Sequence, residues 1–405
     1  MKQYIFVLGS THKLCEAELL AVLKQNGVNQ VSFTSIYPIV ILKTSTHIDS
    51  CKLINVLGGT IKIAEVIKSV AMPTVEDLIS IFKTLISTQS ITLGISNYSS
   101  LNLSLKNLGA AIKTQLRGDR QKIRYLLPRE GNVLSSVVIK KQKVTEYLLC
   151  TDKDSQMLIA ETQAIQDFED WSQRDFDRPW ADPHSGMLPP KVARMMINLA
   201  ISHLPKDSPA LSTLLDPFCG MGTILAEAML RGIPVIGSDI SSTVVQRCRA
   251  NIAWLKTRYP EFAQPTTRIE EADAVHISDK IAANSIDLVV TEPVLGGPFE
   301  RKAGQIYYKQ QILSREKLKD MITGLTKLYI GALKDWQLVL KPQSVVVIAF
   351  PAIVFAENEY SVKKVIDNCE KHGYTMVSGP YVYGRPQAIV KRNIYILKRG
   401  KLNIN

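Results

Sequence analysis

A short stretch in the middle of the chain constrains the fold more than any other. Residues 214–223 have the sequence Leu-Leu-Asp-Pro-Phe-Cys-Gly-Met-Gly-Thr, and a run rich in Ala, Leu and Met follows to Leu230. Apolar residues, an acid, two glycines and a helix-forming run predict a buried strand, a tight turn and a helix. Gly220 and Gly222 lack a Cβ, so the backbone can bend sharply and a ligand can approach the amides. Nucleotide-type ligands bind at such turns in α/β sheets, although Gly-x-Gly is also common in purely structural turns.

Asp216, at the end of the expected strand, indicates the kind of ligand. A fixed negative charge repels a pyrophosphate, whereas it suits a ligand with an amino group and a positive charge. S-adenosylmethionine has both features. We therefore expect this cofactor to contact five residues of the turn: Asp216, Phe218, Cys219, Gly220 and Gly222.

Two further acids follow short apolar segments. Asp239 ends Val235-Ile236-Gly237-Ser238-Asp239, about 20 residues after Asp216, the interval at which a carboxylate accepts hydrogen bonds from ribose hydroxyls. Ile240 follows it directly and is also expected to contact the cofactor. Asp273 and Ala274 come after the next segment, where the adenine amino group would lie, although Asp273 also suits a helix cap.

A fourth acid, Glu292, directly follows the apolar segment 286–291 and is itself followed by Pro293. The exocyclic amine of a nucleobase is a poor nucleophile, because its lone pair is delocalised into the ring. Acceptors held against the amine hydrogens localise that pair, and orientation toward the methyl donor supplies much of the rate. We expect Glu292 and Pro293 to perform this catalytic role.

Several of these motifs resemble one family. The chain resembles the THUMP-containing tRNA guanosine-N2 methyltransferases of archaeal and eukaryotic type, which modify position 10. The resemblance is carried by residues 216–223, Thr291-Glu292-Pro293, 186–194, 57–66 and 134–138. The resemblance covers most of the chain. It implies methyl transfer from S-adenosylmethionine to the N2 amine of a guanosine in tRNA, with Met187 and Leu188 beside the cofactor. Family members often work with a small zinc-containing activator subunit, which the resemblance allows as a partner.

The chain departs from the family motif at two positions. Glu292 stands where the family has Asp or Asn, and Leu295 stands where it has an aromatic that stacks on the extruded base. Either Phe299 supplies the stacking surface, or the pocket accepts its base differently. Two alternatives therefore stay open: methylation of another amine such as adenine N6 in RNA or DNA, and a tRNA-binding homologue without activity.

The charge distribution favours a nucleic acid partner. The formal net charge is +12, and residues 101–143 hold ten Lys or Arg against two acids. A nearly single-signed stretch is typical of a surface that binds a phosphate backbone. Arg174 and Arg178 follow in an aromatic segment, where they either face RNA or pair with Asp175 and Asp177. The expected RNA-binding residues are Lys106, Lys113, Arg117, Arg120, Lys122, Arg124, Arg129, Lys140, Lys141, Arg174 and Arg178.

Periodicity predicts an α/β chain of several domains. We expect a ferredoxin-like domain at 1–70, a THUMP RNA-binding domain at 71–165 with a strand at 135–140, and a linker at 166–186. A Rossmann-like, doubly wound methyltransferase domain with an antiparallel hairpin at the sheet's end is expected at 187–405. The six cysteines show no metal or disulfide spacing, and no apolar run is long enough to span a bilayer. These features predict a cytoplasmic protein without a metal or a membrane partner.

Overall fold

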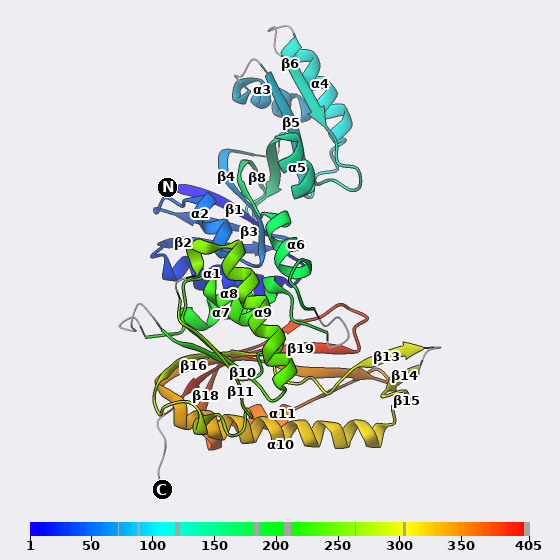
Figure 1. Cartoon of the computed structure of the whole chain (residues 1–405). Coiled ribbons are helices and arrows are strands. Elements are labelled where there is room, and N and C mark those ends of the chain that lie inside the picture. Colours follow the sequence, from blue (N-terminus) through cyan, green and yellow to red (C-terminus); the bar gives the residue numbers. More distant parts are fainter. Residues whose placement is uncertain are drawn as a thin grey trace. The chain divides into compact units, whose positions relative to one another are not determined.

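The computed structural model describes residues 1–71, 73–86, 90–117, 122–181, 186–205, 212–263, 265–302 and 305–400, without the side chains of Leu116, Arg117 and Lys122. Two compact units make up the chain (Figure 1). The first contains Met1–Leu19 and Leu23–Glu169, and the second contains Leu20–Val22 and Asp170–Asn405. Each unit has its own eight-stranded sheet system.

The sheet of the first unit has the strand order β2-β3-β1-β4-β8-β7-β5-β6. Its strands are β1 (Lys2–Leu8), β2 (Gln30–Ile36), β3 (Ile39–Thr44), β4 (Thr60–Ala71), β5 (Ser90–Asn97), β6 (Lys122–Leu126), β7 (Thr145–Thr151) and β8 (Gln156–Ile165). Its helices are α1 (His12–Gln25), α2 (Ser50–Val56), α3 (Val75–Leu85), α4 (Leu105–Arg117) and α5 (Ser136–Gln142). Strand β4 pairs with β1 on one side and β8 on the other, so one sheet spans the regions expected to form two domains. The ferredoxin-like and THUMP assignments stay predictions.

One expected strand of this unit is a helix. Residues 135–140 belong largely to α5, because the Ser135 hydroxyl accepts a hydrogen bond from the Val138 amide and caps the helix. Ile139 is buried with Leu134 and Val144. The β-branched residues that favoured a strand prediction are thus outweighed by a cap and by burial of one helical face.

The second unit contains the predicted doubly wound sheet. Its strand order is β11-β10-β9-β12-β16-β19-β18, parallel from β11 to β16 and antiparallel from β16 to β18. The strands are β9 (Leu214–Asp216), β10 (Val235–Asp239), β11 (Thr267–Glu271), β12 (Ile286–Thr291), β16 (Leu340–Phe355), β17 (Asn358–Ser361), β18 (Tyr374–Tyr383) and β19 (Val390–Arg399). The helices are α6 (Phe168–Phe176), whose first two residues belong to the first unit, α7 (Pro190–Ser202), α8 (Thr223–Met229), α9 (Ser242–Arg258), α10 (Arg315–Val339) and α11 (Lys363–Asp367). The Rossmann-like part of the prediction is confirmed.

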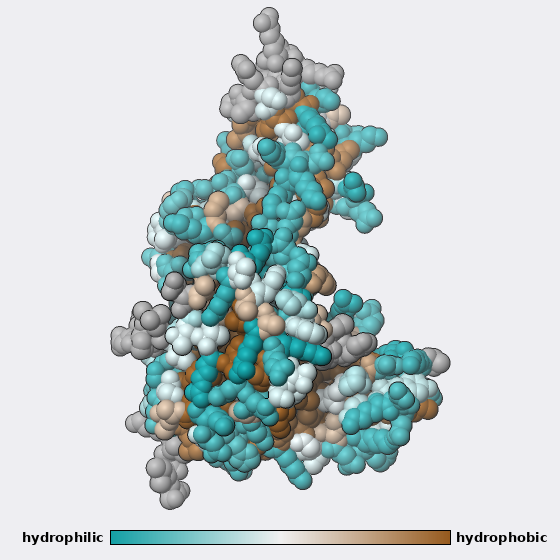
Figure 2. Space-filling model, viewed as in Figure 1, coloured by the Kyte–Doolittle hydropathy of each residue, from teal (hydrophilic) through white to brown (hydrophobic). Residues whose placement is uncertain are grey.

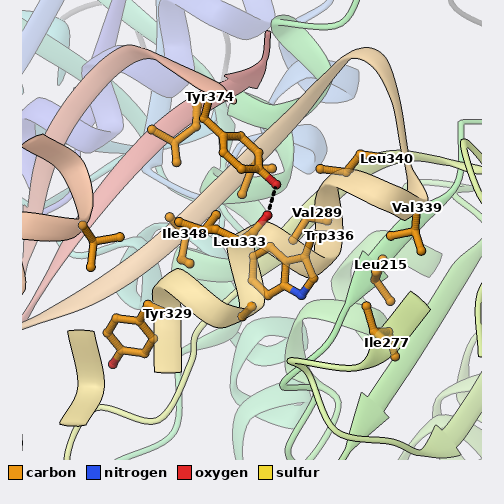
Figure 3. Close-up of a cluster of buried hydrophobic side chains, with 14 of the residues drawn as sticks. Leu215, Ile277, Val289, Tyr329, Leu333, Trp336, Val339, Leu340, Ile348 and Tyr374 are labelled. Carbon is orange, nitrogen blue, oxygen red and sulfur yellow. Dashed lines mark hydrogen bonds between the residues drawn. The ribbon is translucent and has the colours of Figure 1, made fainter. Parts of the chain in front are cut away.

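Helix α10 packs its apolar side against this sheet and so helps to form the core of the second unit. Trp336 and Leu333 lie with Val289 of β12 and Ile348 of β16 in one buried cluster (Figure 3). The Tyr374 hydroxyl donates to the Leu333 carbonyl at 2.8 Å. The Trp336 indole donates to the Ala274 carbonyl at 2.9 Å, which holds the loop after β11 against the helix.

A small antiparallel sheet follows β12. It consists of β13 (Phe299–Lys302), β14 (Gln305–Tyr308) and β15 (Gln311–Ile312), and Figure 2 shows mostly hydrophilic residues over this end of the unit. Gly296 and Gly297 precede it with φ of 107° and 120°, backbone conformations that side chains disfavour. No helix within the described residues combines the length and apolarity needed to cross a bilayer.

Candidate functional site

The turn between β9 and α8 places a buried acid at the edge of the sheet. Asp216 ends β9 and is 1% exposed. Its Oδ1 accepts hydrogen bonds from the Thr291 hydroxyl at 2.7 Å and the Phe218 amide at 3.2 Å. Gly220 and Gly222 have φ of 49° and 84°, so the turn needs residues without a Cβ.

Burial raises the pKa of Asp216 to about 7, while the hydrogen bonds from Thr291 and Phe218 act in the opposite direction. The negative charges of Asp239 and Glu292 raise this pKa further. Among the described residues, no cation pairs with Asp216 or Asp239. A positively charged ligand would therefore relieve the mutual repulsion of these acids.

Asp239 lies beside this turn, because β9 and β10 are neighbours and Asp216 pairs in register with Gly237. Its carboxylate accepts hydrogen bonds from the Ser241 amide at 3.0 Å and from the Gly220 amide at 3.3 Å. The second of these joins the acid directly to the glycine turn.

The two acids share one cavity with Glu292, which follows β12. The cavity has a volume of about 310 Å³. Its lining includes eight residues of the expected cofactor and catalytic sets besides Asp239, namely Met187, Leu188, Asp216, Phe218, Cys219, Gly220, Glu292 and Pro293. The rest of the lining is Met221, Thr223, Ile224, Val244, Val294, Leu295, Gly297 and Pro298. An acidic floor and a mostly apolar wall thus meet in one concave site.

Glu292 has a partner that the sequence did not suggest. The Arg392 guanidinium, on β19, donates through Nε to Glu292 Oε1 and through Nη2 to the Gly186 carbonyl. Burial raises the pKa of Glu292, and the charge and hydrogen bond of Arg392 oppose that rise. One signal was present in the sequence: Arg392 is two residues from both Val390 and Ile394, so it shares the face of the strand with these apolar side chains.

Four expected cofactor residues lie outside the cavity lining. Gly222 faces α9, and a Cβ there would come within 2.7 Å of Cys248 Sγ. Ile240 is 71% exposed. Asp273 accepts from the Val275 amide and lies 3.5 Å from His276 Nδ1, and Ala274 is buried with its carbonyl on Trp336. Their contacts with a cofactor stay a prediction.

Phe299 lies outside the cavity lining, so its stacking on a base stays a prediction. Its ring packs against Tyr308 of β14, with a centroid distance of 5.6 Å, in a cluster built on Ile306 and Leu313. The cavity wall is formed by Val294, Leu295 and Pro298 instead. The same cavity is also lined by the aromatic ring of Phe218, from the turn after β9.

Cys219 is the cavity's only cysteine among the described residues, and its thiol is not activated. A hydrogen bond with Cys248 and burial raise the pKa of Cys219 well above its usual value. A neutral, buried thiol is a poor nucleophile.

Comparison with known proteins bears on this cavity. The family of RMKL-like methyltransferase domains matches residues 179–321, which include the cavity segments. The chain is similar to methyltransferases. The tRNA (guanine(10)-N2)-dimethyltransferase of Methanothermobacter thermautotrophicus is 31% identical over 154 residues, covering 38% of this chain and 39% of that protein. The tRNA (guanine(10)-N2)-dimethyltransferase of Pyrococcus abyssi is 30% identical over 124 residues, covering 31% of each.

The fold has a solved counterpart. The crystal structure of TrmN from Thermus thermophilus matches with a TM-score of 0.54 at 12% identity, covering 98% of this chain and 99% of that chain. Whereas this match shows a shared fold over nearly the whole chain, the curated relatives align over 39% or less of their own length.

Two expected RNA-binding residues are buried in the second unit, and that expectation is wrong. Arg174 is 7% exposed, pairs with Asp170 and Glu227, and stacks on Trp171 at 3.8 Å from the ring centroid. Arg178 is 8% exposed, donates to the Thr223 hydroxyl at 2.7 Å and lies 3.7 Å from the Asp175 carboxylate, which is one of the two pairings left open by the sequence. Both arginines connect α6 and the residues directly after it to α8 and do not face solvent.

The other expected RNA-binding residues belong to the first unit. Lys106, Arg124, Arg129 and Lys141 are exposed, and Lys113 is half-buried. Lys140 is exposed but pairs with Asp167 at 2.8 Å and Glu169 at 3.2 Å. Arg120 and the side chains of Arg117 and Lys122 lie outside the described residues.

Proposed function

We propose that this protein transfers a methyl group from S-adenosylmethionine to the N2 amine of a guanosine in tRNA. The observation that carries the proposal is the shared cavity at the carboxyl ends of β9, β10 and β12, with an acid from each strand end. Ligands of open α/β sheets bind at this edge. The similarity to methyltransferase domains covers the same residues.

The cavity residues fit the proposed cofactor. S-adenosylmethionine supplies an activated methyl group on a positively charged sulfonium, and it also carries an ammonium group. Asp216 and Asp239 provide negative charge that no described cation neutralises, and Met187 and Leu188 provide apolar contact. The Asp239 carboxylate suits the ribose hydroxyls, because it follows the second strand of the βαβ unit.

Glu292 and Pro293 are suited to hold the target amine. The Glu292 carboxylate accepts hydrogen bonds from amine hydrogens, which localises the nitrogen lone pair. Pro293 fixes the backbone beside it, and Val294, Leu295 and Pro298 form an apolar wall for a flat base. These residues orient the nucleophile and exclude water, and orientation then supplies much of the rate.

The finer points of the proposal rest on the family resemblance and on the names of the relatives. We place the target at position 10 of tRNA, because both curated relatives are named for that guanosine. Residues 71–165 of the first unit would act as the THUMP domain and hold the tRNA by its phosphates through exposed cations such as Lys106 and Arg124. A small zinc-containing activator subunit and a cytoplasmic location belong to the same proposal.

The experiment is methylation of undermodified tRNA by the full chain with S-adenosylmethionine, followed by digestion to nucleosides and mass spectrometry. The expected product is N2-methylguanosine, and Glu292→Ala removes it while cofactor binding is retained. A digest with N6-methyladenosine instead would identify an adenine methyltransferase. Binding of tRNA without any methylated product would identify the inactive tRNA-binding homologue.

A further inference from the structure

The small sheet β13–β15 begins directly at the wall of the cavity. Gly297 and Pro298 line the cavity, and Phe299 is the first residue of β13. The Tyr308 ring of β14 lies against this wall, because a Cβ on Gly297 would come within 2.8 Å of Tyr308 Cε2. Residues 299–312, here termed the arm, therefore adjoin the place proposed for the target base.

The inward face of the arm anchors it to the rest of the second unit. Phe299 and Tyr308 are opposite each other in the strand register, and their rings pack together at 5.6 Å between centroids. Both pack against a buried cluster that contains Ile306 and Leu313 together with Leu318 of α10. The arm is thus fixed to α10 by an apolar contact and is not attached through its two ends alone.

The outward face of the arm carries an aromatic and an aliphatic side chain next to each other. Tyr307 of β14 is opposite Ile312 of β15, and both lie on the face away from the buried cluster, because successive residues of a strand alternate between faces. Ile312 is 52% exposed, and Tyr307 is half-buried, with its hydroxyl donating to Gln305 Oε1 at 3.3 Å. Such a ring can stack on any base, since every base has a π-face.

The arm and the first turn of α10 are rich in exposed cations. The Lys317 ammonium donates to Gln311 Oε1 of β15 at 2.5 Å, so the start of α10 lies beside the arm. Of the cations in residues 299–318, only Lys302 forms an ion pair within the described part of the chain, with Glu300 at 2.6 Å. Cations without acid partners favour a phosphate backbone, whose counterions they release on binding. Residues 299–318 hold two acids and five exposed cations, which are Arg301, Lys302, Lys309, Arg315 and Lys317.

A target base that is extruded into the cavity stays joined to its neighbours through the sugar–phosphate backbone, so the flanking nucleotides lie at the rim. We propose that the arm is an RNA-binding surface in addition to the cations of residues 101–143: Tyr307 stacks on a base next to the target nucleotide, and Lys309 and Arg315 contact the adjoining phosphates. RNA fits this surface better than a protein partner does, because the apolar pair is small and the cations near it lack acids. This inference rests on the proposed function and names the part of the substrate that the second unit holds outside the cavity.

Three variants of the full chain test the arm. Tyr307→Ala removes the stacking surface, and Tyr307→Phe keeps the ring without its hydroxyl. The double variant Lys309→Gln with Arg315→Gln removes two cations. Each is assayed for methylation of undermodified tRNA, for tRNA binding across a salt series, and for binding of S-adenosylhomocysteine by calorimetry. The matched controls are Phe262→Ala, at an exposed aromatic outside the cavity lining, and the double variant Lys363→Gln with Lys364→Gln, at exposed positions of α11.

Tyr307→Ala is expected to lower kcat/KM for tRNA about 5- to 100-fold, mainly through KM, which is the size of one lost stack between a base and an aromatic ring. Tyr307→Phe keeps most of this value, because stacking needs only the face of the ring. Loss of Lys309 and Arg315 reduces the slope of log affinity against log salt by about 2, one unit per phosphate contact. S-adenosylhomocysteine binds all variants as it binds wild type, because none of these residues lines the cavity.

Ultraviolet crosslinking of the wild-type protein to tRNA detects the contact without any methylation. Tryptic digestion and mass spectrometry should find the peptide that contains Tyr307 joined to a nucleotide beside the target guanosine. Absence of that crosslink would overturn the inference, as would a wild-type kcat/KM in Tyr307→Ala or an equal loss in Phe262→Ala. A surface that binds a protein instead would leave every tRNA measurement at its wild-type value.

A folding defect and a wrong proposed function can both be told apart from failure of the inference. If Tyr307→Ala no longer binds S-adenosylhomocysteine, the wild-type crosslink and the salt slope of the double cation variant decide in its place. If the proposed function is wrong, wild type forms no N2-methylguanosine, while the crosslink and the salt slopes still show whether the arm holds RNA.

Discussion

The burial of the Asp216 carboxylate lowers the free energy of unfolding of the protein without a bound ligand. The acid is buried, has a pKa of about 7, and has Asp239 and Glu292 as negatively charged neighbours. A group whose pKa is raised by folding binds its proton more tightly in the native state than in the unfolded chain. The native state is therefore penalised progressively as pH rises from about 4 to 7, and the full penalty persists above that range.

Asp216→Asn should consequently stabilise the protein without ligand. The Asn carbonyl can still accept from the Thr291 hydroxyl, and the buried charge is gone. The gain in free energy of unfolding is about zero near pH 4, grows up to neutral pH, and has an upper limit of about 4 kcal/mol. Urea unfolding by tryptophan fluorescence measures it, because all four tryptophans lie in the second unit. The same variant should bind S-adenosylmethionine much more weakly. A loss of stability at alkaline pH would contradict this account of Asp216.

Residues within one motif were more predictable than residues paired across the sheet. The meeting of Asp216, Asp239 and Glu292 in one cavity could be predicted, because each acid lies at the end of a short apolar strand and parallel strands bring their carboxyl ends to one edge of the sheet. Arg392 is 100 residues from Glu292 in sequence, so no local pattern shows that they pair. Arg174 and Arg178 were misassigned because an arginine charge can be stabilised either by solvent or by buried acids. Glu227, the buried acid that pairs with Arg174, is distant in sequence, so no local pattern indicates the pair.

At the scale of elements, the turn before α8 depends on a glycine that packs against α9. Gly222 has φ of 84°, and a Cβ would lie 2.7 Å from Cys248 Sγ. Gly232 has φ of 75° and no atom within 4 Å of such a Cβ, so it isolates the backbone effect. Gly232→Ala should cost about 1–2 kcal/mol of unfolding free energy, and Gly222→Ala should cost more, because the clash adds to the same strain. Denaturant unfolding of both variants checks this prediction. Equal losses of unfolding free energy would show that α9 moves to accommodate the Cβ without destabilising the protein.

Helix α8 is also fixed by a buried charge network. Glu227 on α8 pairs with Arg174 of α6 and with Arg194 of α7, the latter at 2.7 Å, and all three side chains are almost fully buried. Glu227→Gln removes the buried anion that Arg174 and Arg194 share, although Arg174 keeps its pair with Asp170, and should destabilise the protein by about 3–5 kcal/mol. Glu261→Gln, at an exposed position, is the control and should have little effect. Thermal unfolding of the second unit measures both. A small effect of Glu227→Gln would mean that solvent reaches the network.

The order of elements in the second unit could be predicted, because strands and helices alternate with clear apolar runs and turn residues. Strand β12, for example, is buried at all six positions and follows a continuous apolar run. The sheet of the first unit could not be predicted in the same way. Its continuity depends on β4 pairing with β8, whose partners are about 100 residues apart, and non-local pairing has no sequence period.

The positive charge of the whole molecule is concentrated in the first unit's residues 101–143, while the acids of the cavity lie in the second unit. If the cations of residues 101–143 hold the tRNA phosphates and the acids of the cavity hold the cofactor, the affinity for tRNA and the affinity for the cofactor should respond to different substitutions. Phosphate contacts release counterions, so their number is reflected in the salt dependence of binding.

Charge reversal at two exposed positions tests this division. The double variant Lys106→Glu and Arg124→Glu should weaken tRNA binding and reduce the slope of log affinity against log salt by about 2, one unit per lost phosphate contact. S-adenosylmethionine binding should be unchanged. The control, Lys363→Glu with Lys364→Glu, makes the same change in net charge at exposed positions of α11. Filter binding across a salt series measures the slopes. Equal slopes in the two double variants would show that net charge alone, and not a surface of the first unit, attracts the tRNA.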